Sequence, residues 1–358
     1  MKKSFALLKL FLGVALVGGV SATVLPSVEA KEPVKLIYDT DMGNDIDDVF
    51  ALAMIHNLEK RGEIEFLALT ITKDNKYAAP YCQLVNTFYG NPNVPIGAVK
   101  DSGVEAFDGK FTRSALEAKT EDGAPMFPFF NLAEDKTEYY DSVKLLRKTL
   151  AAQPDGSVVV AQVGASTNLV RLLDTKGDEF SPLNGRELAI KKIKYVSTMA
   201  GAFTNEMAGH PEQFVKDMAN HREYNIIIDL PAAQRFFAEW PTPIVASGFE
   251  VGRQITMTPA MMKNDYEYVP NHPLKKAYID YRGLDNEQCT WDLTSILYAA
   301  RPDRGYFGVS EPGVVSVDEK GLTRLTPKAD GNVRILTLSP EQKVRVQTTF
   351  EWLCSEKL

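Results

Sequence analysis

The chain contains little cysteine, with only Cys82, Cys289 and Cys354 among 358 residues. A disulfide-stapled fold is therefore excluded, and we expect no disulfide, because a chain of this length buries enough apolar surface to be stable without one. Long apolar runs are scarce as well. Beyond the first 30 residues, no segment reaches the roughly 20 apolar residues that a membrane-spanning helix needs. We therefore expect no stable insertion into a membrane.

Excess positive charge is also absent. The 40 Lys and Arg residues are outnumbered by 47 Asp and Glu residues, which gives a formal net charge of −7. A polyanionic partner such as a nucleic acid is therefore not expected. With 44% hydrophobic and 24% charged residues, the composition is that of a globular protein and excludes a disordered, collagenous or coiled-coil chain.

The first 30 residues have the pattern of an export signal. A basic start at Lys2 and Lys3 precedes an apolar run from Leu10 to Val20, and Val28-Glu29-Ala30 follows as a small-x-small cleavage site. The run is too short to span a membrane. We expect cleavage near Lys31, an exported protein in the periplasm or outside the cell, and a single domain over 31–358.

From Val34 onward, short β-branched runs alternate with longer helical stretches. This alternation predicts an α/β fold with an open, mostly parallel, Rossmann-like sheet flanked by helices, whose ligands bind at the carboxyl ends of the strands. Strands are expected at 34–39, 64–72, 95–97, 157–163 and 194–199, and helices at 47–59, 79–89, 139–152 and 167–173.

Two segments depart from this alternation. The stretch from Asp101 to Glu134 is rich in Gly, Phe and charge, and its length predicts a functional flap. From Gly313 to Leu338, period-two runs are broken by Glu319-Lys320-Gly321 and Asp330-Gly331, which predicts a C-terminal β-hairpin appendage on the same domain.

The segment after the first predicted strand concentrates negative charge. Five carboxylates fall within ten residues, namely Asp39, Asp41, Asp45, Asp47 and Asp48. Capping of the following helix explains one or two of them, since acids near a helix N-terminus gain about 0.3–1 kcal/mol each. The rest repel one another unless a cation neutralises them, and hard divalent ions such as Ca²⁺ prefer carboxylate and carbonyl oxygens. The sequence therefore predicts a metal site here.

Other acidic motifs fit this segment less well. An EF-hand loop requires Gly at its sixth position and Glu at its twelfth, where this chain has Asn44 and Phe50. A metal-dependent phosphatase with Asp39 as nucleophile and Asp41 as acid/base remains an alternative, although Gly43 stands where such enzymes usually have Thr or Val.

The same residues resemble the signature of nucleoside hydrolases, the nucleoside N-ribohydrolases. The resemblance begins with the strand, the Asp39-Thr40-Asp41-x-Gly43 turn and the Asp47-Asp48 pair that opens a helix, and it extends over nearly the whole chain after the signal. This sequence has Met42 where the family has Pro. It also has two extra residues before the acidic pair, so Asp45 has no clear counterpart.

Four further family landmarks follow in order. They are Thr70 to Asn75, Val163 to Asn168, Glu223-Tyr224-Asn225, and Trp291-Asp292 before an apolar helix. Each has a simpler explanation when taken alone, such as turn formation by an Asn, a solvated strand edge, a core Trp or a helix cap. The five landmarks in sequence order are much more specific than any one of them.

The resemblance implies a calcium-dependent enzyme that hydrolyses the N-glycosidic bond of ribonucleosides. By position, Ca²⁺ would be held by Asp41, Asp48, Asp292 and the main-chain carbonyl of Val163, and Asp41 would also be the general base. The substrate-binding residues would be Asn75, Glu223, Asn225 and Asp47.

Trp291 stands where pyrimidine-tolerant relatives have His, and it resembles the Trp of purine-preferring members, which stacks on the departing base. We therefore expect a catalytic role for Trp291 and a preference for purine nucleosides. A homo-oligomer is also expected. The non-enzymatic alternative is an exported nucleoside-binding protein that does not turn over its ligand.

Overall fold

Buried parallel strands form the centre of the computed structural model, which describes residues 32–100, 104, 110–130, 138–204 and 220–356. The predicted export signal at 1–30 and parts of the predicted flap lie outside these residues. From Pro33 onward the chain forms one compact unit. The described part of this unit contains a sheet of 11 strands, in the order β12-β11-β13-β7-β6-β5-β1-β2-β3-β4, with β10 paired to β13.

The central strands are parallel, as the sequence predicts. Every neighbouring pair from β13 through β7, β6, β5, β1, β2 and β3 to β4 is parallel, whereas β10, β11 and β12 pair antiparallel. The strands are β1 Val34–Thr40, β2 Ile64–Ile71, β3 Ile96–Ala98, β4 Tyr140–Asp141, β5 Val158–Gln162, β6 Ile193–Met199, β7 Ile244–Ser247, β10 Gly308–Val309, β11 Gly313–Val317, β12 Thr323–Pro327 and β13 Val333–Thr337, and a separate pair is formed by β8 Thr256–Met257 and β9 Gln288–Cys289.

Helices connect the strands and cover the sheet. They are α1 Asp47–Lys60, α2 Ala78–Phe88, α3 Lys110–Leu116, α4 Ser142–Ala152, α5 Thr167–Leu173, α6 Gly185–Lys192, α7 Tyr224–Ile227, α8 Leu230–Glu239, α9 Phe249–Gly252, α10 Pro259–Asn264, α11 Pro273–Tyr281, α12 Asp292–Ala300 and α13 Pro340–Ser355, with a 3₁₀ turn at Pro302–Arg304.

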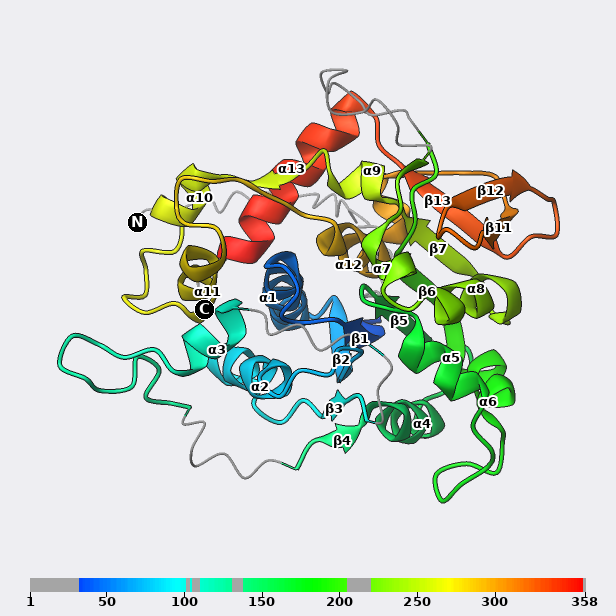
Figure 1. Cartoon of the computed structure of the whole chain (residues 1–358), viewed down its shortest axis with the longest axis horizontal. Helices are drawn as coiled ribbons and strands as arrows, with labels where there is room; N and C mark the ends of the chain where they lie inside the picture. The colour runs from blue at the N-terminus through cyan, green and yellow to red at the C-terminus, as the bar shows by residue number, and fades with distance from the viewer. Residues whose placement is uncertain (1–31, 101–103, 105–109, 131–137, 205–219, 357–358) are drawn as a thin grey trace, which may run out of the picture. The chain divides into compact units, whose positions relative to one another are not determined.

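Strand β1 is apolar on both faces because helices cover both. Leu36 and Tyr38 pack into the core beneath α1, α12 and α13, whereas Ile37 packs into the core beneath α4, α5, α6 and α8. Figure 1 shows α1 and α12 on one side of the central strands and α5, α6 and α8 on the other. The continuous apolar run Leu36-Ile37-Tyr38 is the expected sequence of such a strand, since these three side chains are fully buried.

Most predicted elements are confirmed, with two differences. Helix α4 begins at Ser142 rather than at Tyr139, because Asp141 is in extended conformation and its side chain accepts a hydrogen bond from the backbone N–H of Lys144. The segment predicted as a flap contains helix α3, which packs against α2 and α11.

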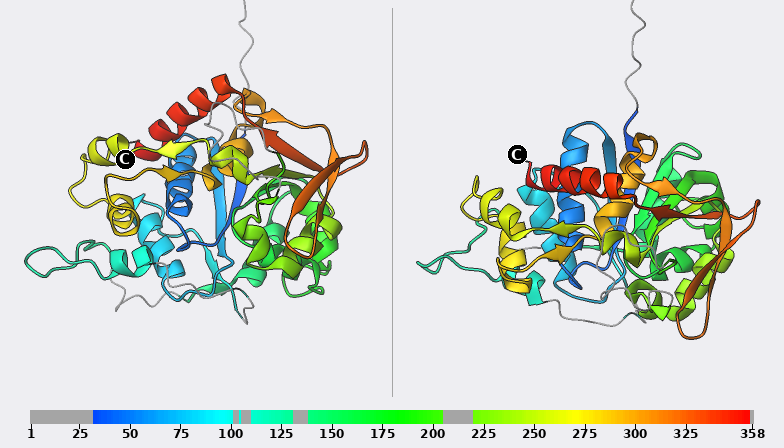
Figure 2. Two further views of the ribbon diagram at one scale, coloured as in Figure 1. Left: turned by 45° about the horizontal axis from the view of Figure 1, so that its top comes forward. Right: turned by 90° about the horizontal axis from the view of Figure 1, so that it is seen from above.

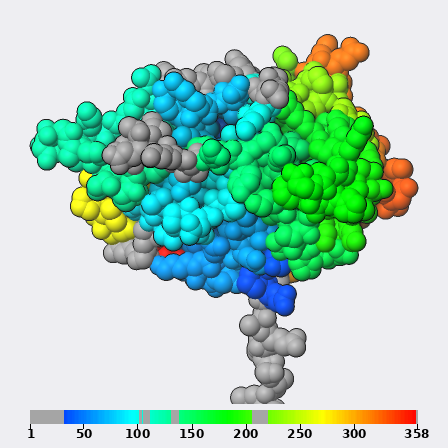
Figure 3. Space-filling model, turned by 90° about the horizontal axis from the view of Figure 1, so that it is seen from below, coloured from blue at the N-terminus to red at the C-terminus, as the bar shows by residue number. Residues whose placement is uncertain are grey.

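The C-terminal hairpin is present and is built from β11 and β12. The views in Figure 2 show it at one edge of the sheet. Strand β13 is not part of an appendage, because it pairs in parallel with β7 through Val333, Arg334 and Ile335 and so extends the main sheet. Figure 3 shows a face of the molecule formed mostly by the segments from α1 to α6.

All three cysteines are buried and carry free thiols. Among the described residues, no helix combines the length and apolar character that crossing a bilayer requires.

Candidate functional site

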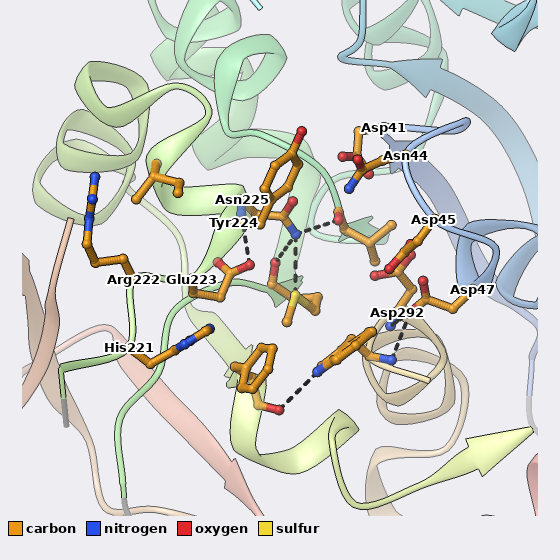
Figure 4. Close-up of a pocket in the computed structure, with 15 residues that line it drawn as sticks. Asp41, Asn44, Asp45, Asp47, His221, Arg222, Glu223, Tyr224, Asn225 and Asp292 are labelled. Carbon is orange, nitrogen blue, oxygen red and sulfur yellow. Dashed lines mark hydrogen bonds between the residues drawn. The ribbon is translucent and has the colours of Figure 1, made fainter. Parts of the chain in front are cut away.

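A cavity of about 310 Å³ opens at the carboxyl ends of the central strands. Its lining comes from the loop after β1, the ends of β5 and β6, the segment around α7, and the starts of α9 and α12. The lining residues are Asp41, Asn44, Asp45, Asp47, Val163, Met199, His221, Arg222, Glu223, Tyr224, Asn225, Ile227, Phe249, Trp291 and Asp292. Figure 4 shows Asp45, Asp47 and Asp292 on one side of the cavity and His221 and Glu223 on the other.

The acidic side, which we call the carboxylate wall, consists of Asp41, Asp45, Asp47 and Asp292. Three of these side chains bring carboxylate oxygens within 4.8 Å of one another, namely Asp45, Asp47 and Asp292. Buried oxygens without a hydrogen-bond partner remain on Asp41 and on Asp47. Because an unpaired buried carboxylate is costly, these oxygens indicate a place for a cation or for a polar ligand.

Asp47 also holds the end of the wall together. Its Oδ2 atom accepts hydrogen bonds from the backbone N–H groups of Trp291, at 2.8 Å, and of Asp292, at 3.1 Å. The first residue of α1 therefore fixes the start of α12, although the two lie far apart in sequence. One oxygen of Asp47 is thus engaged, whereas Asp45, from the two-residue insertion, lines the cavity beside it.

Two further acids of the loop lie behind the wall. Asp48 is fully buried and accepts a hydrogen bond from Thr40. Asp39 is fully buried as well, and its Oδ1 atom accepts hydrogen bonds from Thr70 at 2.5 Å and from Asn168 at 2.8 Å. A phosphatase nucleophile must reach its substrate, and Asp39 does not line the cavity, so the geometry contradicts the phosphatase alternative.

Burial is the main cause of the electrostatics of the wall. It raises the pKa of Asp41 to about 7, although the positive charge of Lys73 acts in the opposite direction. The pKa of Asp47 is raised to about 6 by burial, and hydrogen bonds oppose that rise. For Asp292, burial and then the charges of neighbouring aspartates raise the pKa well above its usual value. A bound cation would reverse these shifts.

Glu223 and Asn225 form the floor opposite the wall. Glu223 accepts backbone N–H groups of Gly201 at 2.9 Å and of Asn225 at 2.8 Å, and it thereby caps the short helix α7. The side-chain amide of Asn225 donates to the carbonyl oxygens of Val163, at 2.7 Å, and of Met199, at 3.0 Å. The Val163 carbonyl keeps a second lone pair, so this contact does not prevent it from binding another ligand.

The remaining side, which we call the aromatic wall, consists of His221, Phe249 and Trp291. The rings of Phe249 and Trp291 are stacked with centroids 5.3 Å apart, and His221 lies 4.0 Å from Phe249 at a tilt of 35°. The indole N–H of Trp291 donates to the carbonyl of Phe249 at 3.1 Å. Gly252 permits this approach, because a Cβ there would lie 2.3 Å from the Cα of Trp291.

The structure brings most predicted site residues together. Asp41, Asp47, Val163, Glu223, Asn225, Trp291 and Asp292 all line the cavity. Asp48 lies behind it. Asn75 is half-buried beside Gly43 and is not part of the described lining.

Sequence reasoning gave no role to Asp45, His221 and Phe249, which line the cavity, or to Lys73, which is buried near Asn44 of the acidic loop. Asp45 has no clear family counterpart, and a lone histidine such as His221 more often has a structural role. Phe249 carried no signal beyond that of a core aromatic. Lys73, which is 1% exposed, lies within the family landmark Thr70 to Asn75. The clue in the sequence was a lysine directly after a buried strand.

Comparisons with known proteins agree with this geometry. A family model described as inosine-uridine preferring nucleoside hydrolase matches residues 36–351. No curated protein sequence matches the chain.

Solved structures share the fold. The inosine-uridine preferring nucleoside hydrolase from Bacillus anthracis has a TM-score of 0.65 and 17% identity, over 90% of this chain and 99% of its own. A purine-preferring ribonucleoside hydrolase from Gardnerella vaginalis has a TM-score of 0.64 and 17% identity, over 90% and 98%. A plant nucleoside hydrolase has a TM-score of 0.62 and 19% identity, over 91% and 100%.

Proposed function

The chain belongs to the inosine-uridine preferring nucleoside hydrolase family, and from that premise we propose that it hydrolyses ribonucleosides to ribose and free base, with Ca²⁺ as cofactor and purine nucleosides as preferred substrates. The observation that carries this proposal is the pairing of the carboxylate wall with the aromatic wall across one cavity of about 310 Å³. A nucleoside needs both surfaces, because its ribose is polar and becomes cationic in the transition state, whereas its base is flat and aromatic.

The residues present fit a hard divalent cation. Carboxylate oxygens converge at Asp45, Asp47 and Asp292, and buried unpartnered oxygens remain on Asp41 and Asp48. The family resemblance assigns the ion to Asp41, Asp48, Asp292 and the Val163 carbonyl, and the position of Asp45 adds a candidate ligand. When bound, Ca²⁺ would lower the pKa of a water molecule and bind ribose hydroxyls.

Asp41 is the proposed general base. Its carboxylate lines the cavity, its Oδ2 atom has no hydrogen-bond partner, and its pKa is raised to about 7 by burial. A base is most effective when its pKa lies near the working pH, and such catalysis contributes about 10²–10⁴-fold. Gly164 permits the chain after β5 to pack closely against Asp41, because a Cβ at Gly164 would lie 2.7 Å from the Asp41 backbone nitrogen.

Ribose would lie between the carboxylate wall and the Glu223–Asn225 floor. Glu223 is 3% exposed and Asn225 is 6% exposed, and both are fixed by backbone contacts, so little side-chain entropy is lost on binding. Negative charge from Glu223 and from the wall would stabilise positive charge that develops on the sugar. Asn75 lies beside Gly43, just outside the lining, and is the further ribose contact that the family resemblance implies.

The aromatic wall supports the purine preference. Trp291 and Phe249 present stacked rings to the cavity, and stacking on aromatic rings is worth about 0.5–1.5 kcal/mol beyond area burial. A base that becomes protonated as it departs is attracted more strongly by such rings. The larger purine gains more from this surface than a pyrimidine does.

The test is a substrate panel. Ribose release from inosine, guanosine and uridine by the purified protein should be fastest for the two purine nucleosides. Tight nucleoside binding without ribose release would instead establish the nucleoside-binding alternative. Uridine hydrolysis as fast as that of inosine would contradict the purine preference and leave the hydrolase assignment intact.

Two expectations from the sequence also remain proposals. We propose that residues 1–30 direct export and are removed near Lys31, and that the protein is a homo-oligomer. N-terminal sequencing of the protein recovered outside the cytoplasm tests the first, with an uncleaved Met1 as the contrary result. Light scattering after size exclusion tests the second, and a mass no greater than the 39.7 kDa of one full-length chain would contradict it.

A further inference from the structure

A buried lysine lies next to the acidic loop. Lys73 follows β2, is 1% exposed, and its Nζ atom lies 3.5 Å from the side-chain oxygen of Asn44. Asn44 lines the cavity, and in the sequence it lies between Asp41 and Asp45. A fully buried ammonium group is costly unless negative charge surrounds it, so its position here requires an electrostatic explanation.

The positive charge of Lys73 acts on acids of the loop after β1. Among the described residues, it lowers the pKa of Asp41, Asp45 and Asp48, against the larger opposing effect of burial. At the other end, the pKa of Asp292 is raised by burial and by the neighbouring aspartates. The lysine therefore compensates part of the loop after β1, while Asp45, Asp47 and Asp292, whose carboxylate oxygens lie within 4.8 Å of one another, still hold excess negative charge.

We propose that Lys73 is a fixed internal cation of the carboxylate wall, which keeps the acidic loop folded before a divalent cation binds and lowers the affinity of the wall for that cation. The proposal rests on the proposed function for the presence of a divalent site. Its physical basis is that buried like charges repel strongly at low dielectric, and that a fixed positive charge beside a cation site repels the incoming ion.

The central test compares two lysine-to-methionine variants. Lys73→Met removes the charge and keeps most of the side-chain volume. Lys192→Met is the matched control, because the side chain of Lys192 is also largely buried and pairs with Asp155 at 2.8 Å. Lys192 is the last residue of α6 and precedes β6, so it lies at the amino end of that strand, opposite the cavity. Both are stripped of metal, and each is titrated with calcium chloride by calorimetry and melted without calcium.

We expect Lys73→Met to bind calcium at least about tenfold more tightly than the wild type, because a repulsive unit charge beside a divalent ion has been removed. Without calcium it should melt at a lower temperature than the wild type. Lys192→Met should bind calcium with wild-type affinity. Unchanged or weaker calcium binding by folded Lys73→Met would overturn the proposal.

A second variant covers the case in which Lys73→Met does not fold without calcium. Removing one negative charge as well, in Asp45→Asn/Lys73→Met, should restore a folded calcium-free protein, since the loop regains its charge balance. If this double variant stays unfolded while Asp45→Asn alone folds, Lys73 acts by packing and the proposal is wrong. Absence of calcium binding by the wild type would count against the proposed function, whereas the calcium-free melting comparison still tests Lys73.

Discussion

The carboxylate wall and the aromatic wall line the same cavity and are held by different means. The carboxylate wall is held by hydrogen bonds that engage some oxygens and leave others free, as when Asp47 uses Oδ2 to fix Trp291 and Asp292 and leaves Oδ1 unpartnered. The aromatic wall is held by ring contacts and one indole hydrogen bond. The first arrangement is suited to a cation and to proton transfer, and the second to a flat base.

The two walls are also joined to each other. Trp291 belongs to the aromatic wall, and its backbone N–H is bound by Asp47 of the carboxylate wall at 2.8 Å. The adjacent residue, Asp292, contributes its carboxylate to the carboxylate wall. A change in either wall is therefore expected to affect the position of the other through the start of α12.

The largest expected effect comes from the carboxylate wall. Asp41→Asn should lower kcat at least about 10²-fold for any accepted nucleoside, because the general base and one charged metal ligand are lost. Steady-state kinetics with inosine would measure it. Asp285→Asn is the control, since Asp285 is 87% exposed and pairs with Lys263 on the surface. Near-normal turnover by a folded, metal-loaded Asp41→Asn would exclude Asp41 as the base.

The difference between the walls explains what sequence alone could predict. Five acids in one loop have no structural purpose that satisfies them all, so the sequence predicts a metal site in this loop, and the family resemblance assigns Asp41 and Asp48 to it. The sheet followed from apolar runs such as that of β1. Phe249 and His221 could not be found, because an aromatic that stacks in a cavity has the same sequence signature as one in a core.

A smaller effect is expected from the aromatic wall. Trp291→Ala should lower kcat for inosine or guanosine by up to about tenfold and change KM less, the pattern of an interaction that strengthens in the transition state. Trp291→Phe retains a ring and should recover most of that loss. Uridine should be a poor substrate throughout. Full purine turnover by Trp291→Ala would reduce Trp291 to a packing residue.

The smallest expected effect is a change of thermal stability with pH. It arises from the buried carboxylates of the cavity and not from the aromatic wall. Burial raises the pKa of Asp41 and of Glu223 to about 7 in the folded, metal-free protein. Such groups favour the folded state at low pH, and that stability is lost as pH rises through the folded-state pKa. Metal-free protein should therefore melt a few degrees lower at about pH 8 than at about pH 6.5.

The lower limit of that pH range avoids an opposing effect. The pKa values of buried His56 and His272 are lowered to about 4 and about 3, so these residues destabilise the folded state only as pH falls below the ordinary histidine value of 6.5. Calcium should remove the loss at about pH 8, because it favours ionised ligands. A melting temperature that rises with pH in the metal-free protein would contradict the buried, uncompensated state of the carboxylates.

The central claim is that the protein hydrolyses nucleosides with a cation bound at the carboxylate wall. Its most direct test measures ribose release from inosine before chelation, after exhaustive chelation, and after calcium is restored. Activity should be abolished by the chelator and recovered with calcium, with the melting temperature falling and rising in parallel. Undiminished ribose release by the fully chelated protein would contradict the claim.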